Sequence, residues 1–173
     1  MATFTMRPTA AGDVTQLTPS AGSNYTCVDE AVANDDTDYV SGVSPGGAPA
    51  TFYDLYAATN HSAEYGTITN VTVYIRCKAT GGAGATAATK VKVGGTEYAG
   101  SDNALTDGVW SNFSTSYNVS PKTTAAWTWA EIDGMQIGVT VTSPNLVVGC
   151  YCTQVYAVVT FSAQKLQQSC VVI

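Results

Sequence analysis

Apolar and polar residues alternate along several segments of this chain with the period of two that is typical of β-strands. The clearest segment is 67–78, in which apolar side chains fall on one face and the intervening residues on the other: Val71, Val73, Ile75 and Cys77 against Thr72, Tyr74, Arg76 and Lys78. The pattern predicts an antiparallel strand with one buried face and one face in water.

A second long segment, 147–161, carries apolar residues on both faces, which is typical of a strand in the middle of a covered sheet. Strict alternation puts Cys150, Cys152 and Tyr156 on one face. The other face then holds Val147, Tyr151, Val155, Ala157, Val159 and Phe161.

Shorter strands are predicted between Gly-, Pro- and Asn-rich turns, at 3–7, 25–28, 51–56, 89–93, 109–119 and 136–142. One short helix is predicted at 128–134, because Thr128 and Glu131 have capping-box spacing and Gly134 can end the turn. The expected fold is all-β, a single antiparallel β-sandwich that resembles a jelly roll.

A chain of 173 residues with 45% hydrophobic content is long enough for one domain with its own core. We expect the sandwich at 9–161, an N-terminal arm or edge strand at 1–8, and a C-terminal tail at 162–173. The tail ends in Val171, Val172 and Ile173, which are predicted to act as an arm onto a neighbouring subunit or to fray.

Charged residues make up 12% of the chain, against about 25% in an average soluble domain. The net charge of −6 argues against nucleic acid as a partner, because nothing resembles the basic stripe that holds phosphates. We see neither a signal peptide nor an apolar run of the roughly 18 residues that cross a bilayer. We therefore expect no membrane partner, and we expect the chain to fold in a cytosol.

Few residues of this chain are suited to catalysis. The one histidine, His61, has no recognisable Ser/His/Asp context, so we expect neither an enzyme nor a cofactor. The five cysteines do not form a readable disulfide framework and are interpreted as buried thiols. Asp36 and Asp38 could supply oxygens to a calcium ion, and the alternative is a turn in which aspartates bond the local backbone.

Aromatic residues are the remaining candidates for binding. Trp127 and Trp129 lie close to the predicted junction of loop and helix. If their rings are exposed, they would form flat platforms for sugar rings or anchors for a protein partner. If their rings are buried, they would plug the end of the sandwich.

Five segments together resemble uncharacterised virion proteins of tailed phages and prophages: YTCVDE at 25–30, DDTDYV at 35–40, DLY at 54–56, ITNVTV at 68–73 and AWTWAEI at 126–132. The resemblance implies a β-sandwich displayed on a particle, as a capsid decoration (cement) protein or a tail-associated protein. It implies a major capsid or tail protein as a partner. Edge strands in a sheet of low charge are sticky, so we also expect other copies of this chain as partners, in a homo-oligomer. The resemblance also implies a place in the virion after assembly in the host cytoplasm.

Two alternatives remain open at this point. The aromatic residues and the calcium hypothesis favour a carbohydrate- or receptor-binding module. The C-terminal arm favours a subunit of a self-assembling extracellular filament.

Overall fold

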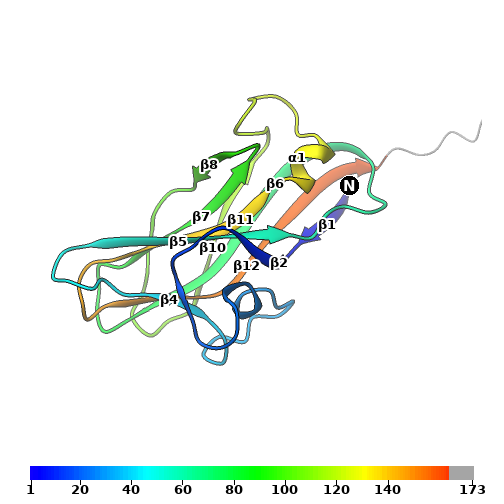
Figure 1. Ribbon diagram of the computed structural model, residues 1–173. Helices are drawn as coiled ribbons and strands as arrows, with labels where there is room; N and C mark the ends of the chain where they lie inside the picture. The colour runs from blue at the N-terminus through cyan, green and yellow to red at the C-terminus, as the bar shows by residue number, and fades with distance from the viewer. Residues whose placement is uncertain (164–173) are drawn as a thin grey trace, which may run out of the picture.

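Two antiparallel β-sheets pack face to face in the computed structural model, which describes residues 1–163 (Figure 1). Sheet A has the order β10-β6-β12-β4-β3, with β1 also paired to β12, and sheet B has the order β2-β5-β11-β7-β8, with β9 also paired to β7. The predicted jelly-roll-like β-sandwich is confirmed.

The strands of sheet A are β1 (Ala2–Met6), β3 (Thr18–Pro19), β4 (Val40–Gly42), β6 (Gly66–Thr80), β10 (Ser111–Tyr117) and β12 (Gly149–Ala163). Those of sheet B are β2 (Pro8–Thr15), β5 (Ala50–Ala58), β7 (Thr86–Val93), β8 (Thr96–Ala99), β9 (Asn103–Ala104) and β11 (Gln136–Ser143). Two short helices complete the described chain, η1 (Asn24–Cys27) and α1 (Trp129–Asp133).

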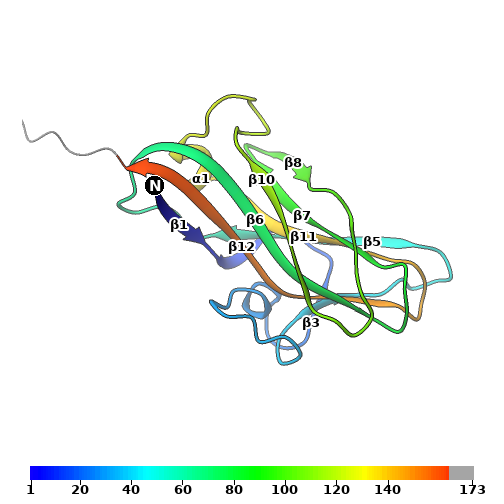
Figure 2. The same ribbon diagram turned by 180° about the vertical axis from the view of Figure 1, so that it is seen from behind.

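The two longest strands, β6 and β12, pair along most of their length in the middle of sheet A (Figure 2). The predicted inward face of β6 is confirmed, since Val71, Val73, Ile75 and Cys77 are all buried in the core. Its other face, with Tyr74, Arg76 and Lys78, is only partly buried and forms the outside of the sheet.

A β-bulge in β12 changes which residues face the core. The register shifts between Cys152 and Gln154, so one residue is added and the alternation changes phase. Cys150 and Cys152 face inward before the bulge, and Val155, Ala157, Val159 and Phe161 face inward after it. The prediction that Tyr151 shares a face with Val155 is therefore wrong, and Tyr151 and Tyr156 both lie on the outer face.

The strand predicted at 25–28 is also wrong, because this segment forms the 3-10 helix η1. The buried side chain of Asn24 donates to the Leu17 carbonyl oxygen (2.7 Å) and to Asp54 Oδ2 (2.6 Å). These two bonds tie η1 to β5 and to the chain entering β3, and the apolar alternation alone gave no sign of them.

The predicted capping box of α1 is confirmed in both directions. Thr128 Oγ1 accepts from the Glu131 amide (3.2 Å), and Glu131 Oε2 accepts from the Thr128 amide (2.9 Å). Two of the amides at the start of this short helix are thus satisfied, and Gly134 caps its end.

Gly138 lies on β11, where the neighbouring strand β5 comes too close for a side chain. A Cβ at this position would sit 2.0 Å from the Asp54 carbonyl oxygen. We expect Gly138→Ala to lower the free energy of unfolding by about 1–3 kcal/mol, measured by urea denaturation. Gly46→Ala is the matched control, because nothing lies within 4 Å of the corresponding position; equal effects of the two changes would contradict the prediction.

Candidate functional site

Partly exposed aromatic side chains gather on the outer face of sheet A, over β6 and β12 and at the residues just before β4 and β10. We call this surface the aromatic face: Tyr39, Tyr74, Trp110, Tyr151 and Tyr156. The antiparallel register of β6 and β12 brings them together, since it places Tyr74 opposite Tyr156 and Lys78 opposite Tyr151.

Tyr74 and Tyr156 form the centre of this face, and we call them the tyrosine pair. Their rings stack with centroids 4.8 Å apart and planes 9° apart. The Arg7 guanidinium lies 5.3 Å from the Tyr156 ring centroid, so the three side chains form a row across the sheet. On the opposite side of Tyr74 lies the exposed Ser114 of edge strand β10. Because serine is small, no large side chain from β10 covers that side of the ring.

Hydroxyl and amide groups flank the tyrosine pair. Asn70 Nδ2 donates to Thr72 Oγ1 (2.7 Å), and the Thr72 and Ser116 hydroxyls hydrogen-bond each other (2.8 Å). Asn70 Oδ1 is buried and has no partner within the described residues. A flat apolar ring next to such groups suits a ligand that combines apolar faces with many hydroxyls.

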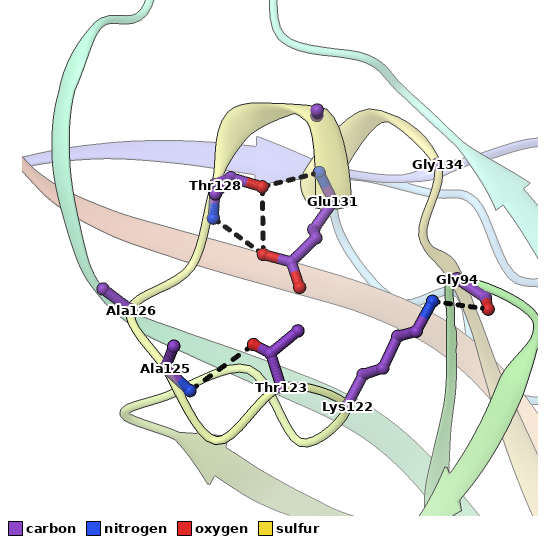
Figure 3. A pocket seen from close by; sticks show the side chains of 9 residues that line it. Gly94, Lys122, Thr123, Ala125, Ala126, Thr128, Glu131 and Gly134 are labelled. Carbon is purple, nitrogen blue, oxygen red and sulfur yellow. Dashed lines mark hydrogen bonds between the residues drawn. The ribbon is translucent and has the colours of Figure 1, made fainter.

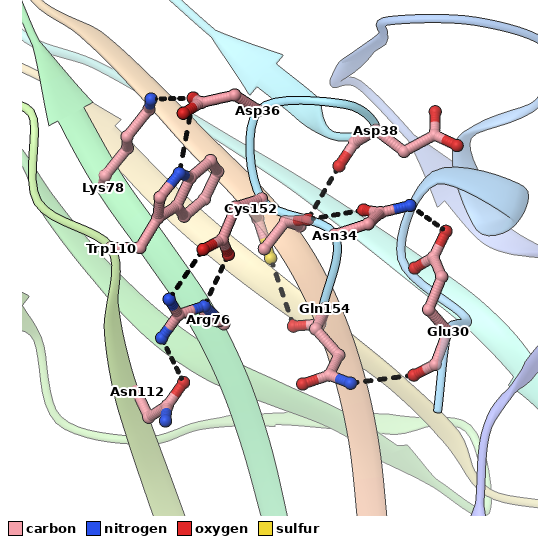
Figure 4. A network of polar contacts seen from close by, with 12 residues as sticks. Glu30, Asn34, Asp36, Asp38, Arg76, Lys78, Trp110, Asn112, Cys152 and Gln154 are labelled. Atoms are coloured by element: carbon pink, nitrogen blue, oxygen red, sulfur yellow. Dashed lines mark hydrogen bonds and ion pairs between the residues drawn. The ribbon is translucent and has the colours of Figure 1, made fainter. Parts of the chain in front are cut away.

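Two carboxylates from the loop before β4 reach onto the same face, in what we call the carboxylate clasp (Figure 4). Asp35 binds Arg76 through two parallel bonds, Nε to Oδ1 (2.6 Å) and Nη2 to Oδ2 (2.8 Å). Asp36 pairs with Lys78, whose Nζ lies 4.7 Å from the Trp110 ring centroid. Asp35 holds this position with φ of 49°, a left-handed conformation that is uncommon for a non-glycine residue.

The clasp should respond to acid. The hydrogen bonds from Arg76 and from Lys78 lower the pKa of Asp35 and of Asp36 from the ordinary value of 3.8. A lowered carboxyl pKa adds stability that is present above about pH 4 and is lost as the pH falls through the value in the folded protein. We therefore expect the clasp to stay closed at pH 4 and to open below it.

Trp110 fluorescence followed from pH 7 to pH 2 measures this opening, because the Trp110 Nε1 donates to Asp36 Oδ1 (3.4 Å). The Asp36→Asn variant is the control and should lose the acid transition of this signal. A transition centred above pH 4 in the wild type would contradict the assigned direction.

The structure does not bring Asp36 and Asp38 together around one point. Asp38 Oδ1 accepts from Ser20 Oγ (3.1 Å), Asp36 is engaged with Lys78, and Figure 4 shows the two carboxylates pointing apart. Within residues 1–163, no group of three or more His, Cys, Asp or Glu side chains is placed to hold a metal ion. Calcium binding by this pair stays a prediction without a geometric basis here.

The two tryptophans lie at the end of the sandwich near α1. Trp127 is 4% exposed, and its Nε1 donates to the Tyr117 carbonyl oxygen (3.0 Å). Trp129 is partly buried between His61 and Phe161, with ring centroids 4.9 Å and 5.2 Å away. Their predicted role in ligand binding stays a prediction. The burial of Trp127 favours the alternative, in which its ring plugs the end of the sandwich. The predicted arm residues Val171, Val172 and Ile173 lie outside the described part of the chain.

His61 pairs with Asp133 rather than with a nucleophile. Its Nδ1 lies 2.8 Å from Asp133 Oδ1, and its backbone amide donates to the same oxygen (3.0 Å). The bond from His61 lowers the pKa of Asp133. These contacts attach the loop after β5 to α1.

A separate cavity of about 520 Å³ lies between the β7–β8 turn and the loop that leads into α1 (Figure 3). Lys122 Nζ donates across it to the Gly94 carbonyl oxygen (2.9 Å), and Glu131 lies on its helical side. The remaining lining is small and mostly apolar: Thr123, Ala125, Ala126, Thr128, Ala130 and Gly134. This volume would hold a small molecule.

The aromatic face was only partly visible in the sequence. Alternation along β6 placed Tyr74, Arg76 and Lys78 together on the wet face. Tyr156 could not be added to them, because strict alternation gives no information on the register between two distant strands. The contact of Arg7 with Tyr156 had no signal in the sequence.

No protein-family model matches the sequence, and no curated protein sequence matches it. Similar solved structures include the CBM22-1 xylan-binding domain of Paenibacillus barcinonensis Xyn10C, at 12% identity over 91% of this chain and 88% of that one, with a TM-score of 0.46. The C-terminal CBM6 of LamC, a marine laminarinase from Zobellia galactanivorans, has 12% identity over 92% and 100%, with a TM-score of 0.49.

A third similar structure is the enzymatically active domain of tailspike protein 4 from bacteriophage CBA120. It has 17% identity over 90% of this chain and 19% of that one, with a TM-score of 0.43. At identities of 12–17% and TM-scores below 0.5, these similarities concern the sandwich fold and not the function.

Proposed function

We propose that this protein is a carbohydrate-binding module without catalytic activity of its own, and that the aromatic face of sheet A is its binding surface. The observation that carries the proposal is the tyrosine pair, which stands on the outer face of a regular sheet between exposed small polar residues on β10 and the guanidinium of Arg7. Aromatic rings supply apolar contact area at low entropic cost, and the neighbouring hydroxyl and amide groups supply hydrogen bonds.

The layout of the face favours an oligosaccharide over a single sugar. Lys78 and Trp110 contact each other four residues along β6 from Tyr74. At about 3.3 Å per residue, this second aromatic position lies about 13 Å from the tyrosine pair. That span exceeds one sugar ring, so a chain of several sugars would be needed to contact both positions.

The experiment that tests the proposal is a glycan array probed with the wild type, followed by affinity electrophoresis in gels that contain the polysaccharides of the positive spots. We expect binding to at least one class of glycan. Both experiments include a calcium-free arm, because the pair Asp36 and Asp38 predicts a calcium dependence that the geometry does not favour. A blank array together with unretarded migration in every gel would contradict the proposal.

A second candidate is the virion role that the sequence resemblance implies, in which the protein binds a capsid or tail subunit as a homo-oligomer. The observation that favours it is a group of exposed large apolar side chains on loops at the end of the sandwich away from α1: Val43, Val109, Leu146 and Val147, each 49–65% exposed. Hydrogen bonding between Ser44 and Ser143 holds two of these loops together.

Exposed apolar groups of this kind are typical of surfaces that contact another protein. Copurification with phage particles tests this candidate. Presence of the protein in purified virions would support it, and its absence from them would contradict it.

A further inference from the structure

Arg7 lies beside the tyrosine pair and forms no ion pair with an acidic side chain of residues 1–163. We propose that Arg7 makes this face selective for acidic oligosaccharides, those whose sugar rings carry a carboxylate group. The inference rests on the proposed carbohydrate-binding function and deepens it by naming the class of sugar.

Most cations of this protein already have an acidic partner. Within residues 1–163, four lysine and arginine side chains form ion pairs with Asp or Glu: Arg76 with Asp35, Lys78 with Asp36, Lys90 with Glu97, and Lys92 with Asp13. Arg7 and Lys122 form none with the described residues. Arg7 lies beside the tyrosine pair, and Lys122 lies at the separate cavity.

Arg7 is held firmly without being neutralised. Its Nη1 donates to the Glu30 carbonyl oxygen and its Nη2 to the Ala31 carbonyl oxygen (3.5 Å). Its own carbonyl oxygen accepts from the Thr59 amide (2.9 Å). Carbonyl oxygens orient the guanidinium but carry no net charge, and a guanidinium has five N–H donors, so donors remain for a further partner.

Glu30, whose backbone oxygen binds Arg7, does not supply the missing charge through its side chain. Glu30 contacts Arg7 through its backbone oxygen, whereas its carboxylate lies 3.3 Å from Asn34 Nδ2 and has a second oxygen that is buried without a partner. Burial, together with the charges of Asp29 and Asp38, raises the pKa of this carboxyl. A carboxylate from outside would thus meet an arginine whose charge is still uncompensated.

The geometry puts Arg7 within reach of a glycan that lies along the row of side chains. Tyr74, Tyr156 and Arg7 follow one another across the strands at successive separations of 4.8 Å and 5.3 Å. A glycan that crosses the strands over the tyrosine pair therefore reaches Arg7 with the next part of its chain. Arginine and carboxylate form paired, charge-assisted hydrogen bonds, which are stronger than bonds between neutral groups.

The test compares oligosaccharides that differ only in one group: β-1,4-linked mannose oligomers against mannuronate oligomers, and β-1,4-linked glucose oligomers against glucuronate oligomers. In each pair a hydroxymethyl group is replaced by a carboxylate. By calorimetry in low salt, we expect the wild type to bind at least one uronate oligomer about 10-fold or more tightly than its neutral counterpart, a preference of about 1.4 kcal/mol. Raising the salt to about 0.5 M should reduce this preference.

Arg7→Gln should reduce the preference to about twofold or less. Lys122→Gln is the matched control, because it removes the same charge from the other lysine or arginine within residues 1–163 that forms no ion pair, and it should keep the preference. Arg7→Lys shows whether a loss in the glutamine variant comes from the missing charge or from misfolding. It keeps the charge, loses the paired geometry, and should retain only part of the preference.

Several results would overturn the inference. They are a wild type without preference for uronates, an unchanged preference in Arg7→Gln, and equal losses in Arg7→Gln and Lys122→Gln. If neutral oligomers bind but uronates are not preferred, the inference fails and the proposed function stands. If neither kind of oligomer binds, both fail.

Discussion

Replacing Asp54 by alanine is expected to lower the free energy of unfolding by about 3–5 kcal/mol, the largest effect on stability that we predict for a single substitution. Asp54 lies on β5 and is 0% exposed. Its Oδ1 accepts from the amides of Gln16 (2.7 Å) and Leu17 (2.9 Å), and its Oδ2 accepts from Asn24 Nδ2 (2.6 Å) and the Tyr56 hydroxyl (3.0 Å).

The physical reason is that this one carboxylate satisfies four donors: two amides from the chain after β2, the Asn24 side chain of η1 and the Tyr56 hydroxyl of β5 itself. Alanine would leave them without a partner, and an unsatisfied buried donor costs about 1–3 kcal/mol. Chemical denaturation measures the change. Asp13→Ala is the control, because Asp13 is an exposed partner of Lys92, and its loss should leave the stability nearly unchanged. A loss of less than about 1 kcal/mol in Asp54→Ala would mean that the chain rearranges to satisfy these groups.

Removing either ring of the tyrosine pair is expected to weaken oligosaccharide binding by about 10-fold or more, equivalent to at least about 1.4 kcal/mol. Each ring supports the other through the stacking contact, so Tyr74→Ala and Tyr156→Ala should each disturb both positions. Tyr74→Phe keeps the ring and loses the hydroxyl, and we expect it to retain most of the affinity. Calorimetry with the best ligand from the glycan array gives these values.

The matched control for the tyrosine pair is Tyr53→Ala. Tyr53 lies on β5 in sheet B, where Lys90 Nζ sits 3.9 Å from its ring centroid, and it has no part in the aromatic face. Its removal should leave the affinity unchanged. If Tyr53→Ala weakens binding as much as Tyr74→Ala does, the binding surface is not the outer face of sheet A.

The sequence predicted the fold class well because the information needed for it is local. Alternation along 67–78 defined β6 and its two faces, and the spacing of Thr128 and Glu131 defined the start of α1. Both signals lie within one strand or one turn, where period and capping chemistry decide the structure.

The candidate site was harder to predict because it depends on contacts between distant segments. The bulge after Cys152 reverses the phase of β12, and only this change places Tyr156 on the same outer face as Tyr74. Arg7 meets Tyr156 across about 150 residues of chain, a contact set by strand order and not by any local pattern. Composition instead drew the prediction to Trp127, whose large apolar ring is used to fill the end of the core.

Binding of oligosaccharides to the aromatic face is tested most directly by NMR, following backbone amide shifts of the 17.9 kDa chain during titration with the best glycan. We expect the shifts to concentrate on the outer face of sheet A, at Tyr74, Ser114 and Tyr156 and at Arg7. Shifts confined to the cavity beside Lys122, or no shifts at any of these positions at saturating glycan, would contradict this expectation.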